Sequence, residues 1–146
     1  MKYIRQATCD DLARIAEIEI FNYRLNFYPI FRNDDYYFQE LQVPKLMQQH
    51  AAFLASIYVY DDGVVKGFIR LDGLQVVKLF VEPVLQGQGI GAKLLDYAIM
   101  LFHADTLWAL EKNTRAIAFY QRHGFQLTGE RIPEEDTDEF LVRMKR

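Results

Sequence analysis

Hydrophobic and polar positions follow a strand-like pattern in the middle of the chain. Three runs rich in β-branched and aromatic residues lie there, at residues 56–60, 64–71 and 74–81. Both connections contain an Asp-Gly pair, at 62–63 and 72–73, which is the strongest short signal of a β-hairpin. The pattern predicts an antiparallel meander, and Gly67 in its second strand predicts a bulge or a close approach of the backbone.

Helical spacing flanks this meander. A short strand is expected at residues 2–6, followed by a helix that begins at Thr8, with Asp11 in the place of a capping-box acid. The inner face of this helix is a stripe made of Leu12, Ile15, Ala16 and Glu19. A second helix is indicated by Ile90, Leu94, Leu95, Ala98, Leu101 and Phe102. Between the first helix and the meander, residues 33–42 are expected to hold a helical piece that Pro44 ends or kinks.

The last third of the chain predicts a parallel crossover. Residues 106–110 form an almost continuous apolar run, which suits a strand buried on both faces. A strand, a helix and a buried strand in this order indicate a parallel pair. Asn113 is placed to cap a further helix that runs through Arg122, with Gly124 in the C′ position, and strands are expected at 125–132 and 140–144. The predicted fold class is therefore α/β, with a mixed sheet that begins as an antiparallel meander.

Composition bounds the class of protein. The 146 residues are 51% hydrophobic, as in a globular chain, and no linker divides them, so one domain over residues 1–146 is expected. A net charge of −3 gives no basic footprint for nucleic acid. The N-terminus lacks the core of a signal peptide, and no apolar run is long enough to span a membrane. With a single cysteine, the chain is expected to be cytoplasmic, without nucleic-acid or membrane partners.

Three glycines precede the second helix, in the stretch VEPVLQGQGIGAKLLDYA. Gly87-x-Gly89-x-x-Ala92 fits a dinucleotide fingerprint, but intervening residues separate it from the preceding strand, and a meander comes first. A nucleoside-triphosphate loop fits less well because no Gly-Lys-Ser/Thr is present. A tight turn alone would need only one glycine. Several N–H groups at a helix N-terminus instead indicate an anion site.

These residues resemble the GNAT superfamily of N-acetyltransferases. Gln86-x-x-Gly89-x-Gly91 is similar to the Gln/Arg-x-x-Gly-x-Gly/Ala signature of that family. The stretch EKNTRAIAFYQRHGF, residues 111–125, resembles its second hallmark, an Asn, then Ala and Tyr in a helix, then Gly-Phe. The order of elements also matches, so the resemblance covers nearly the whole chain. It implies the GNAT-like mixed sheet with helices on both faces.

The resemblance implies acetyl-CoA as the cosubstrate. Its diphosphate would be held by the glycine loop, Gln86, Gly87, Gln88, Gly89, Ile90, Gly91 and Ala92. Its pantetheine arm would pair with the backbone of Leu79, Phe80 and Val81, and one N–H there would face the thioester oxygen as in an oxyanion hole. Asn113 would contact the arm as well as cap its helix. Tyr120 would be the general acid toward the CoA sulfur, although its spacing alone would favour a core tyrosine.

No general base is assigned. Gln75 and Trp108 hold the places where family members carry a glutamate, so Glu111, Glu82, water or an amine that arrives neutral stay open. No metal is expected, because the histidines are isolated and show no ligand spacing, at His50, His103 and His123.

The acceptor should be recognised by residues 21–50, whose tyrosines can line a pocket. The acids expected to attract a cationic amine there are Asp34, Asp35 and Glu40. The acidic loop at 133–139 is expected to be a solvated tip that also favours amines over anions. The predicted function is acetyl transfer to a primary amine of a small molecule or peptide by direct attack in a ternary complex. A non-catalytic acyl-CoA sensor and an NAD(P)-binding oxidoreductase stay open as alternatives, as does a homodimer.

Overall fold

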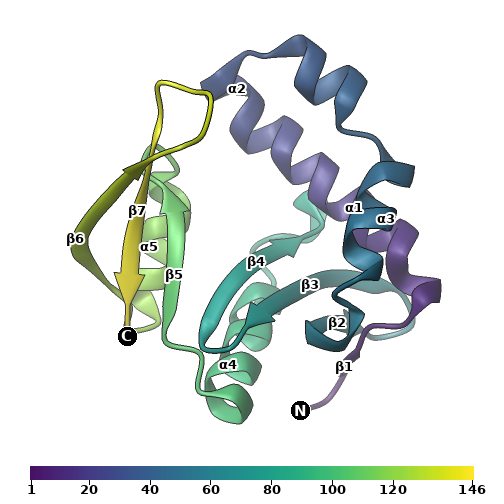
Figure 1. Ribbon diagram of the computed structural model, residues 1–146. Helices are drawn as coiled ribbons and strands as arrows, with labels where there is room; N and C mark the ends of the chain where they lie inside the picture. The colour runs from purple at the N-terminus through teal and green to yellow at the C-terminus, as the bar shows by residue number, and fades with distance from the viewer.

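A seven-stranded mixed sheet organises the protein, which a computed structural model describes over all of residues 1–146 (Figure 1). The strand order is β1-β2-β3-β4-β5-β7-β6. The strands are β1 (Ile4–Gln6), β2 (Ile57–Asp61), β3 (Val65–Asp72), β4 (Gln75–Val81), β5 (Thr106–Leu110), β6 (Gln126–Pro133) and β7 (Phe140–Lys145). The helices are α1 (Leu12–Asn22), α2 (Tyr28–Phe31), α3 (Val43–Ala51), α4 (Ile90–Phe102) and α5 (Thr114–Arg122). The predicted α/β class is confirmed, since β2, β3 and β4 form the antiparallel meander and β4 runs parallel to β5.

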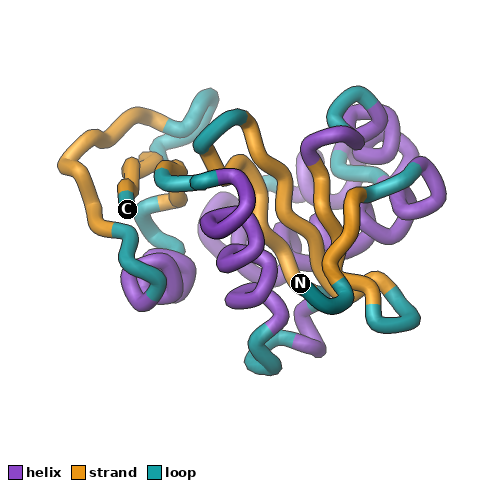
Figure 2. The backbone as a smooth tube through the Cα atoms, turned by 90° about the horizontal axis from the view of Figure 1, so that it is seen from below, coloured by secondary structure: helices purple, strands orange, loops and turns teal.

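Helices cover both faces of the sheet, as Figure 2 shows. The strand β3 contributes side chains to both faces, because successive side chains of a strand point to opposite sides of a sheet. Ile69 packs with Leu94 and Leu95 of α4, while Phe68 packs with Ile15 of α1. The apolar stripe predicted for the first helix is therefore buried. None of the helices is long and apolar enough to cross a membrane.

The segment before α3 differs from the sequence prediction in one respect. A π-helical turn at Asp35–Glu40 lies inside the predicted helical piece, but Pro44 neither ends nor kinks it. Pro44 lies in the first turn of α3, behind the N-cap Gln42. Proline suits that place because a first-turn N–H has no acceptor within the helix and the ring presets φ.

The neighbouring strands β4 and β5 separate soon after they pair. Their register contains only Gln75↔Thr106 and Val76↔Leu107. The pairing of β3 with β4 shifts beyond these residues, so that Val77 is an extra residue in β4, and such bulges bend a strand and increase its twist. Figure 1 shows the two strands diverging from this point. The backbone of β4 after the bulge therefore has no strand partner on the β5 side.

Gly67 gives the close approach that the sequence predicts. A Cβ atom at this position would lie 3.0 Å from the carbonyl oxygen of Phe80 and 3.2 Å from Cδ1 of Leu94. The register of β2 and β3 also shifts beside it, between Tyr60 and Asp61. A side chain here would push α4 away from the sheet.

We expect Gly67→Ala to lower the free energy of unfolding by about 1–3 kcal/mol, because the new methyl group overpacks the contact with a fixed carbonyl. Gly91→Ala is the matched control, since its Cβ atom would lie 3.6 Å from Val81 Cγ2, an ordinary contact. Chemical denaturation measures both variants. Equal stability of the two would contradict this account of Gly67.

Candidate active site

Two adjoining cavities occupy the region where β4 and β5 separate. The loop cavity, of about 430 Å³, lies between the glycine loop, the end of β4 and α5. The aromatic cavity, of about 640 Å³, lies between residues 23–40, the middle of β4 and the loop that joins β6 to β7. The two share the wall residues Phe27, Leu79, Phe80, Asn113, Ala116 and Tyr120. Tyr120 therefore stands at the junction of the two cavities.

Most of the residues that the sequence assigns to acetyl-CoA line the loop cavity. They are Leu79, Phe80, Val81, Gln86, Gly87, Gly89, Ile90, Gly91, Ala92, Asn113 and Tyr120. Gln88 is the exception, because it does not line this cavity. The fold thus gathers three separate segments around one space, while their role in binding stays a prediction.

The glycine loop presents a row of free N–H groups. From Gly87 to Ala92, no backbone N–H donates to an acceptor in the protein, and no side chain caps α4. Gly87 and Gly89 have φ angles of +85° and +83°, a left-handed conformation that glycine adopts without strain and that lets successive N–H groups face one side. Such donors at the positive end of a helix fit a diphosphate.

The end of β4 offers part of its backbone to a ligand. The Glu82 N–H donates to the Lys66 carbonyl at 2.9 Å. By the alternation of an antiparallel ladder, Leu79 and Val81 then turn their polar groups away from β3. These groups face the side on which β5 has separated, so an extended ligand can pair with them.

The Val81 carbonyl is an exception, because the protein itself uses it. It accepts hydrogen bonds from Asn22 Nδ2 at 2.8 Å and from Gln86 Nε2 at 3.3 Å. Gln86 Nε2 also donates to Asn22 Oδ1 at 3.0 Å. The Gln86 side chain thus ties the loop to β4 and α1, and the Val81 N–H and both polar groups of Leu79 are left for a ligand.

Two arginines that sequence reasoning missed line the loop cavity. Arg115 and Arg122 lie on α5, two helical turns apart and so on one face. Guanidinium groups suit phosphate because their donors match its oxygens. The sequence contained a signal for this pair, because both arginines follow the predicted cap Asn113 at a spacing that puts them on one face of the helix.

Tyr120 is a packed residue as well as a wall residue. Its ring lies edge-on to those of Phe119 and Phe125, with centroids 5.3 and 5.9 Å away. Burial raises the pKa of the Tyr120 phenol above its usual value. The hydroxyl is therefore a neutral hydrogen-bond donor at physiological pH, and full proton transfer from it is more difficult than from an exposed phenol.

Asn113 caps α5 as the sequence predicts. Its Oδ1 atom accepts a hydrogen bond from the Ala116 N–H at 3.3 Å. The amide nitrogen makes no hydrogen bond within the protein, and the residue lines both cavities. The capping role leaves that nitrogen available to a ligand.

Neither acid that stayed open as the base reaches a cavity wall. Glu111 accepts two hydrogen bonds from Arg131, at 2.8 and 2.9 Å, and this pairing lowers the pKa of its carboxyl. Glu82 accepts a hydrogen bond from Arg14 at 3.1 Å. Both carboxylates are thus occupied by arginines outside the cavities, which disfavours them as bases.

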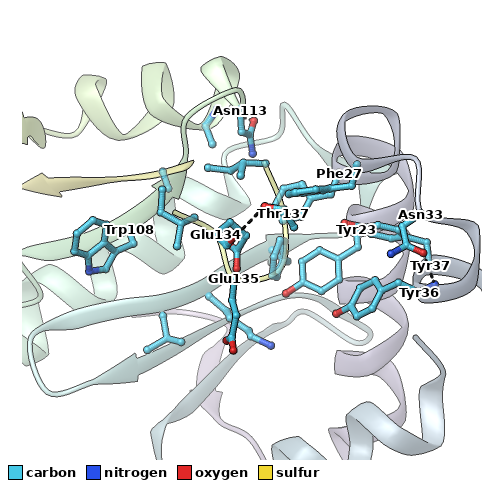
Figure 3. A pocket seen from close by; sticks show the side chains of 18 of the residues that line it. Tyr23, Phe27, Asn33, Tyr36, Tyr37, Trp108, Asn113, Glu134, Glu135 and Thr137 are labelled. Carbon is cyan, nitrogen blue, oxygen red and sulfur yellow. Dashed lines mark hydrogen bonds between the residues drawn. The ribbon is translucent and has the colours of Figure 1, made fainter. Parts of the chain in front are cut away.

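Aromatic rings dominate the wall of the second cavity. Figure 3 shows Tyr23, Tyr36 and Tyr37 on one side and Trp108 on the other. Burial, with a contribution from the charge of Glu134, raises the pKa of Tyr37 to about 12. Of the acids predicted to attract an amine, Glu40 lines the cavity, but Asp34 and Asp35 do not. The Asp34 carboxylate instead accepts a hydrogen bond from the Tyr28 hydroxyl.

The loop between β6 and β7 is more than the solvated tip that its composition predicts. Its residues Glu134, Glu135, Asp136 and Thr137 line the aromatic cavity. Figure 3 labels Glu134, Glu135 and Thr137. The loop is closed by the Glu134 N–H, which donates to the Glu139 carbonyl at 2.8 Å. It reaches the cavity because β7 lies between β5 and β6 in the sheet.

The histidines do not come together. His50 is buried against α1, whereas His103 and His123 are at the C-terminal ends of α4 and α5. No group of three or more His, Cys, Asp or Glu side chains is arranged to hold a metal ion.

The mixed sheet opens beside a glycine loop and the N-terminus of α4, which is the arrangement that the resemblance to the GNAT superfamily implies. Residues 54–127, just over half of the chain, match the sequence model of the acetyltransferase (GNAT) domain. The chain belongs to this family, so the resemblance is confirmed.

A curated relative is similar to this chain in sequence, and solved structures are similar to it in fold. A stretch of 73 residues is 38% identical to the peptidyl-lysine N-acetyltransferase YjaB of Salmonella typhimurium, and it covers 50% of each protein. The sequence match thus spans about half the length of this curated relative. The solution structure of apo YjaB from Escherichia coli is 22% identical, with a TM-score of 0.73 over 97% of this chain and 95% of that one. PaiA N-acetyltransferase of Thermoplasma acidophilum, solved with coenzyme A, is 18% identical, with a TM-score of 0.71 over 98% of both chains.

We expect Gly91→Glu to weaken CoA binding by roughly a hundredfold or more, because its carboxylate would face the diphosphate. Gly91→Ala should keep the affinity, since a Cβ atom fits there at ordinary contact distance. Isothermal calorimetry with CoA measures both. Gly91 is a better test than Gly89, whose positive φ would strain any side chain. Wild-type affinity in Gly91→Glu would refute the placement of the diphosphate.

Proposed function

We propose that this protein transfers an acetyl group from acetyl-CoA to a primary amine of a small molecule or peptide. One observation carries the proposal, namely that a cavity suited to a phosphate-bearing arm shares a wall with an aromatic and acidic cavity. The shared wall contains Tyr120 and the free backbone of Leu79. Family membership supports acetyl-CoA as the donor.

The residues of the loop cavity fit acetyl-CoA by their chemistry. The N–H groups from Gly87 to Ala92 would hold the diphosphate, with Arg115 and Arg122 adding positive charge. The polar groups of Leu79 and the Val81 N–H would pair with the pantetheine arm as a neighbouring strand does. When bound, acetyl-CoA supplies an acetyl group activated as a thioester.

The chain contributes positioning and hydrogen bonds. As the C–N bond forms and the C–S bond breaks, the amine loses a proton and the sulfur gains one. A backbone N–H of Leu79 or Val81 would donate to the thioester oxygen, where negative charge develops. Tyr120 would donate a hydrogen bond to the departing sulfur. Since Glu82 and Glu111 lie outside both cavities, we propose that the amine enters neutral or loses its proton to water.

The aromatic cavity would receive the acceptor. Its carboxylates favour a cation over an anion, and aromatic faces attract ammonium groups as well. The matched relative is named for peptidyl-lysine, which supports an amine acceptor within a peptide. Catalysis without a metal, a cytoplasmic location and a single-domain organisation belong to the same proposal.

We expect Tyr120→Phe to lower turnover by roughly a hundredfold, the usual scale for a lost general acid or donor. The affinity for CoA should stay unchanged, because the ring keeps its packing. Tyr58→Phe makes the same change in a tyrosine that packs against Tyr97 and Phe102, outside both cavities, and should be silent. Release of free thiol gives the rate, and calorimetry gives the affinity. Equal rates for the two variants would remove Tyr120 from the mechanism.

A screen of chemically diverse amines for thiol release from acetyl-CoA tests the activity itself. We expect turnover with at least one primary amine and no tight binding of NAD(P). Tight CoA binding without turnover of any amine would contradict the proposal and favour a sensor of the same fold. Binding of NAD(P) without binding of CoA would contradict both.

A further inference from the structure

A buried charge network lies behind the aromatic cavity, and the mechanism above does not use it. Glu19 of α1 is fully buried. Its Oε1 lies 2.7 Å from His50 Nε2, and its Oε2 accepts a hydrogen bond from Lys78 Nζ at 2.6 Å. Burial acts to raise the pKa of Glu19, but the bonds to His50 and Lys78 outweigh it, so the pKa lies below its usual value. The carboxylate is therefore ionised.

Packing alone does not account for this network. Charges are costly to bury, and apolar residues of similar volume often stabilise a protein equally well. The arrangement carries further costs, because Lys78 is paired with the cation Arg70 across β3 and β4, and His50 Nδ1 is buried without a partner. By pairing with Lys78, Glu19 fixes the ammonium group of that residue at one place on β4.

That place is the wall of the aromatic cavity. Lys78 is the one cationic side chain in its lining, and it stands next to the shared wall residues Leu79 and Phe80. An ammonium group has three donors, and within the protein Lys78 donates only to Glu19. The other N–H donors of the Lys78 ammonium group make no hydrogen bond within the protein, and the buried carboxylate of Glu19 fixes the position of that group.

We propose that Lys78 is a specificity-determining residue, which donates a hydrogen bond to a carbonyl oxygen adjacent to the reacting amine. This inference rests on the proposed acetyltransferase function. Of the two candidate donors to the thioester oxygen, only Leu79 lines the aromatic cavity, and Lys78 precedes it on β4. With the thioester at Leu79, a group one carbon away from the amine would lie in the part of the cavity that Lys78 lines. The preferred acceptors are therefore α-amino amides, including peptide N-termini, over amines flanked only by methylene groups, such as a lysine side chain.

A neutral oxygen fits this subsite better than a carboxylate. Lys78 is already neutralised by Glu19, while the other charged wall residues are acids, Glu40, Glu134, Glu135 and Asp136. A second negative charge on the acceptor would meet repulsion from these acids. The carbonyl of an amide accepts a hydrogen bond without bringing that charge.

The first test compares two amines that differ in one carbonyl-bearing group, L-phenylalaninamide and 2-phenylethylamine. The readout is the ratio of their kcat/KM values in each variant divided by the same ratio in the wild type, which cancels the difference in basicity between the amines. Lys78→Met alone would leave Glu19 as an uncompensated buried charge and unfold easily. The informative variant is therefore Glu19→Gln combined with Lys78→Met, checked for folding by thermal denaturation.

We expect the ratio to fall roughly tenfold or more in that double variant, the scale of a hydrogen bond to a charged group. Lys78→Arg, which keeps charge and donors, should recover most of the preference. Lys66→Met is the matched control, since Lys66 pairs with Asp62 at 2.9 Å outside the cavity, and its ratio should match the wild type. An unchanged ratio in the double variant, or an equal loss for both amines, would overturn the proposal.

A second measurement needs no variant. The wild type is offered one peptide sequence in two forms, with a free N-terminus and an acetylated lysine, or with an acetylated N-terminus and a free lysine. We expect faster thiol release with the free N-terminus, and faster release with the free lysine would overturn the proposal. Failure of the proposed function is distinguishable, because neither peptide nor either small amine would then release thiol.

Discussion

The separation of β4 from β5 is the constraint on which the site depends. Had the parallel pairing continued past Val76, β5 would have satisfied the free polar groups of Leu79 and Val81 and closed the space on both sides of them. The bulge at Val77 bends β4 away instead. Polar backbone groups without a partner are costly in a protein interior, so this edge favours a ligand that pairs as a strand would.

The same separation lets two cavities of different electrostatic character share one wall. The loop cavity is positive because of backbone donors, a helix end and two arginines on α5, although the chain as a whole has a net charge of −3. The aromatic cavity is lined by carboxylates and one neutralised cation. Local donors rather than net charge therefore decide which ligand each cavity favours.

The sequence predicted those parts of the fold that local chemistry determines. The Asp-Gly turns, the cap at Asn113 and the glycine loop each depend on residues within a few positions of one another. Interactions between distant elements were not predictable in this way. Asn22 bonds to Val81 across 59 positions of sequence, and only the packing of α1 on β4 brings the two together.

The buried network of Glu19, His50 and Lys78 was likewise not predictable from local sequence. The helical stripe placed Glu19 on the inner face of α1, but a carboxylate there gives no indication of its partners until α3 and β4 are in place. Likewise, Glu134, Glu135 and Asp136 line a cavity because of the β5-β7-β6 order, which no local pattern specifies. The prediction that Pro44 ends or kinks the preceding helical piece was wrong for a related reason. A proline can follow one helix or begin the next, according to where the next N-cap lies.

The junction between the cavities also constrains how Tyr120 can act. Its phenol is packed against Phe119 and Phe125, and burial raises its pKa, so the environment opposes a phenolate. A group that resists losing its proton is a poor acid but a steady hydrogen-bond donor. Charge on a departing sulfur would then be stabilised by donation, and the proton would reach the thiolate from water after the amide had formed.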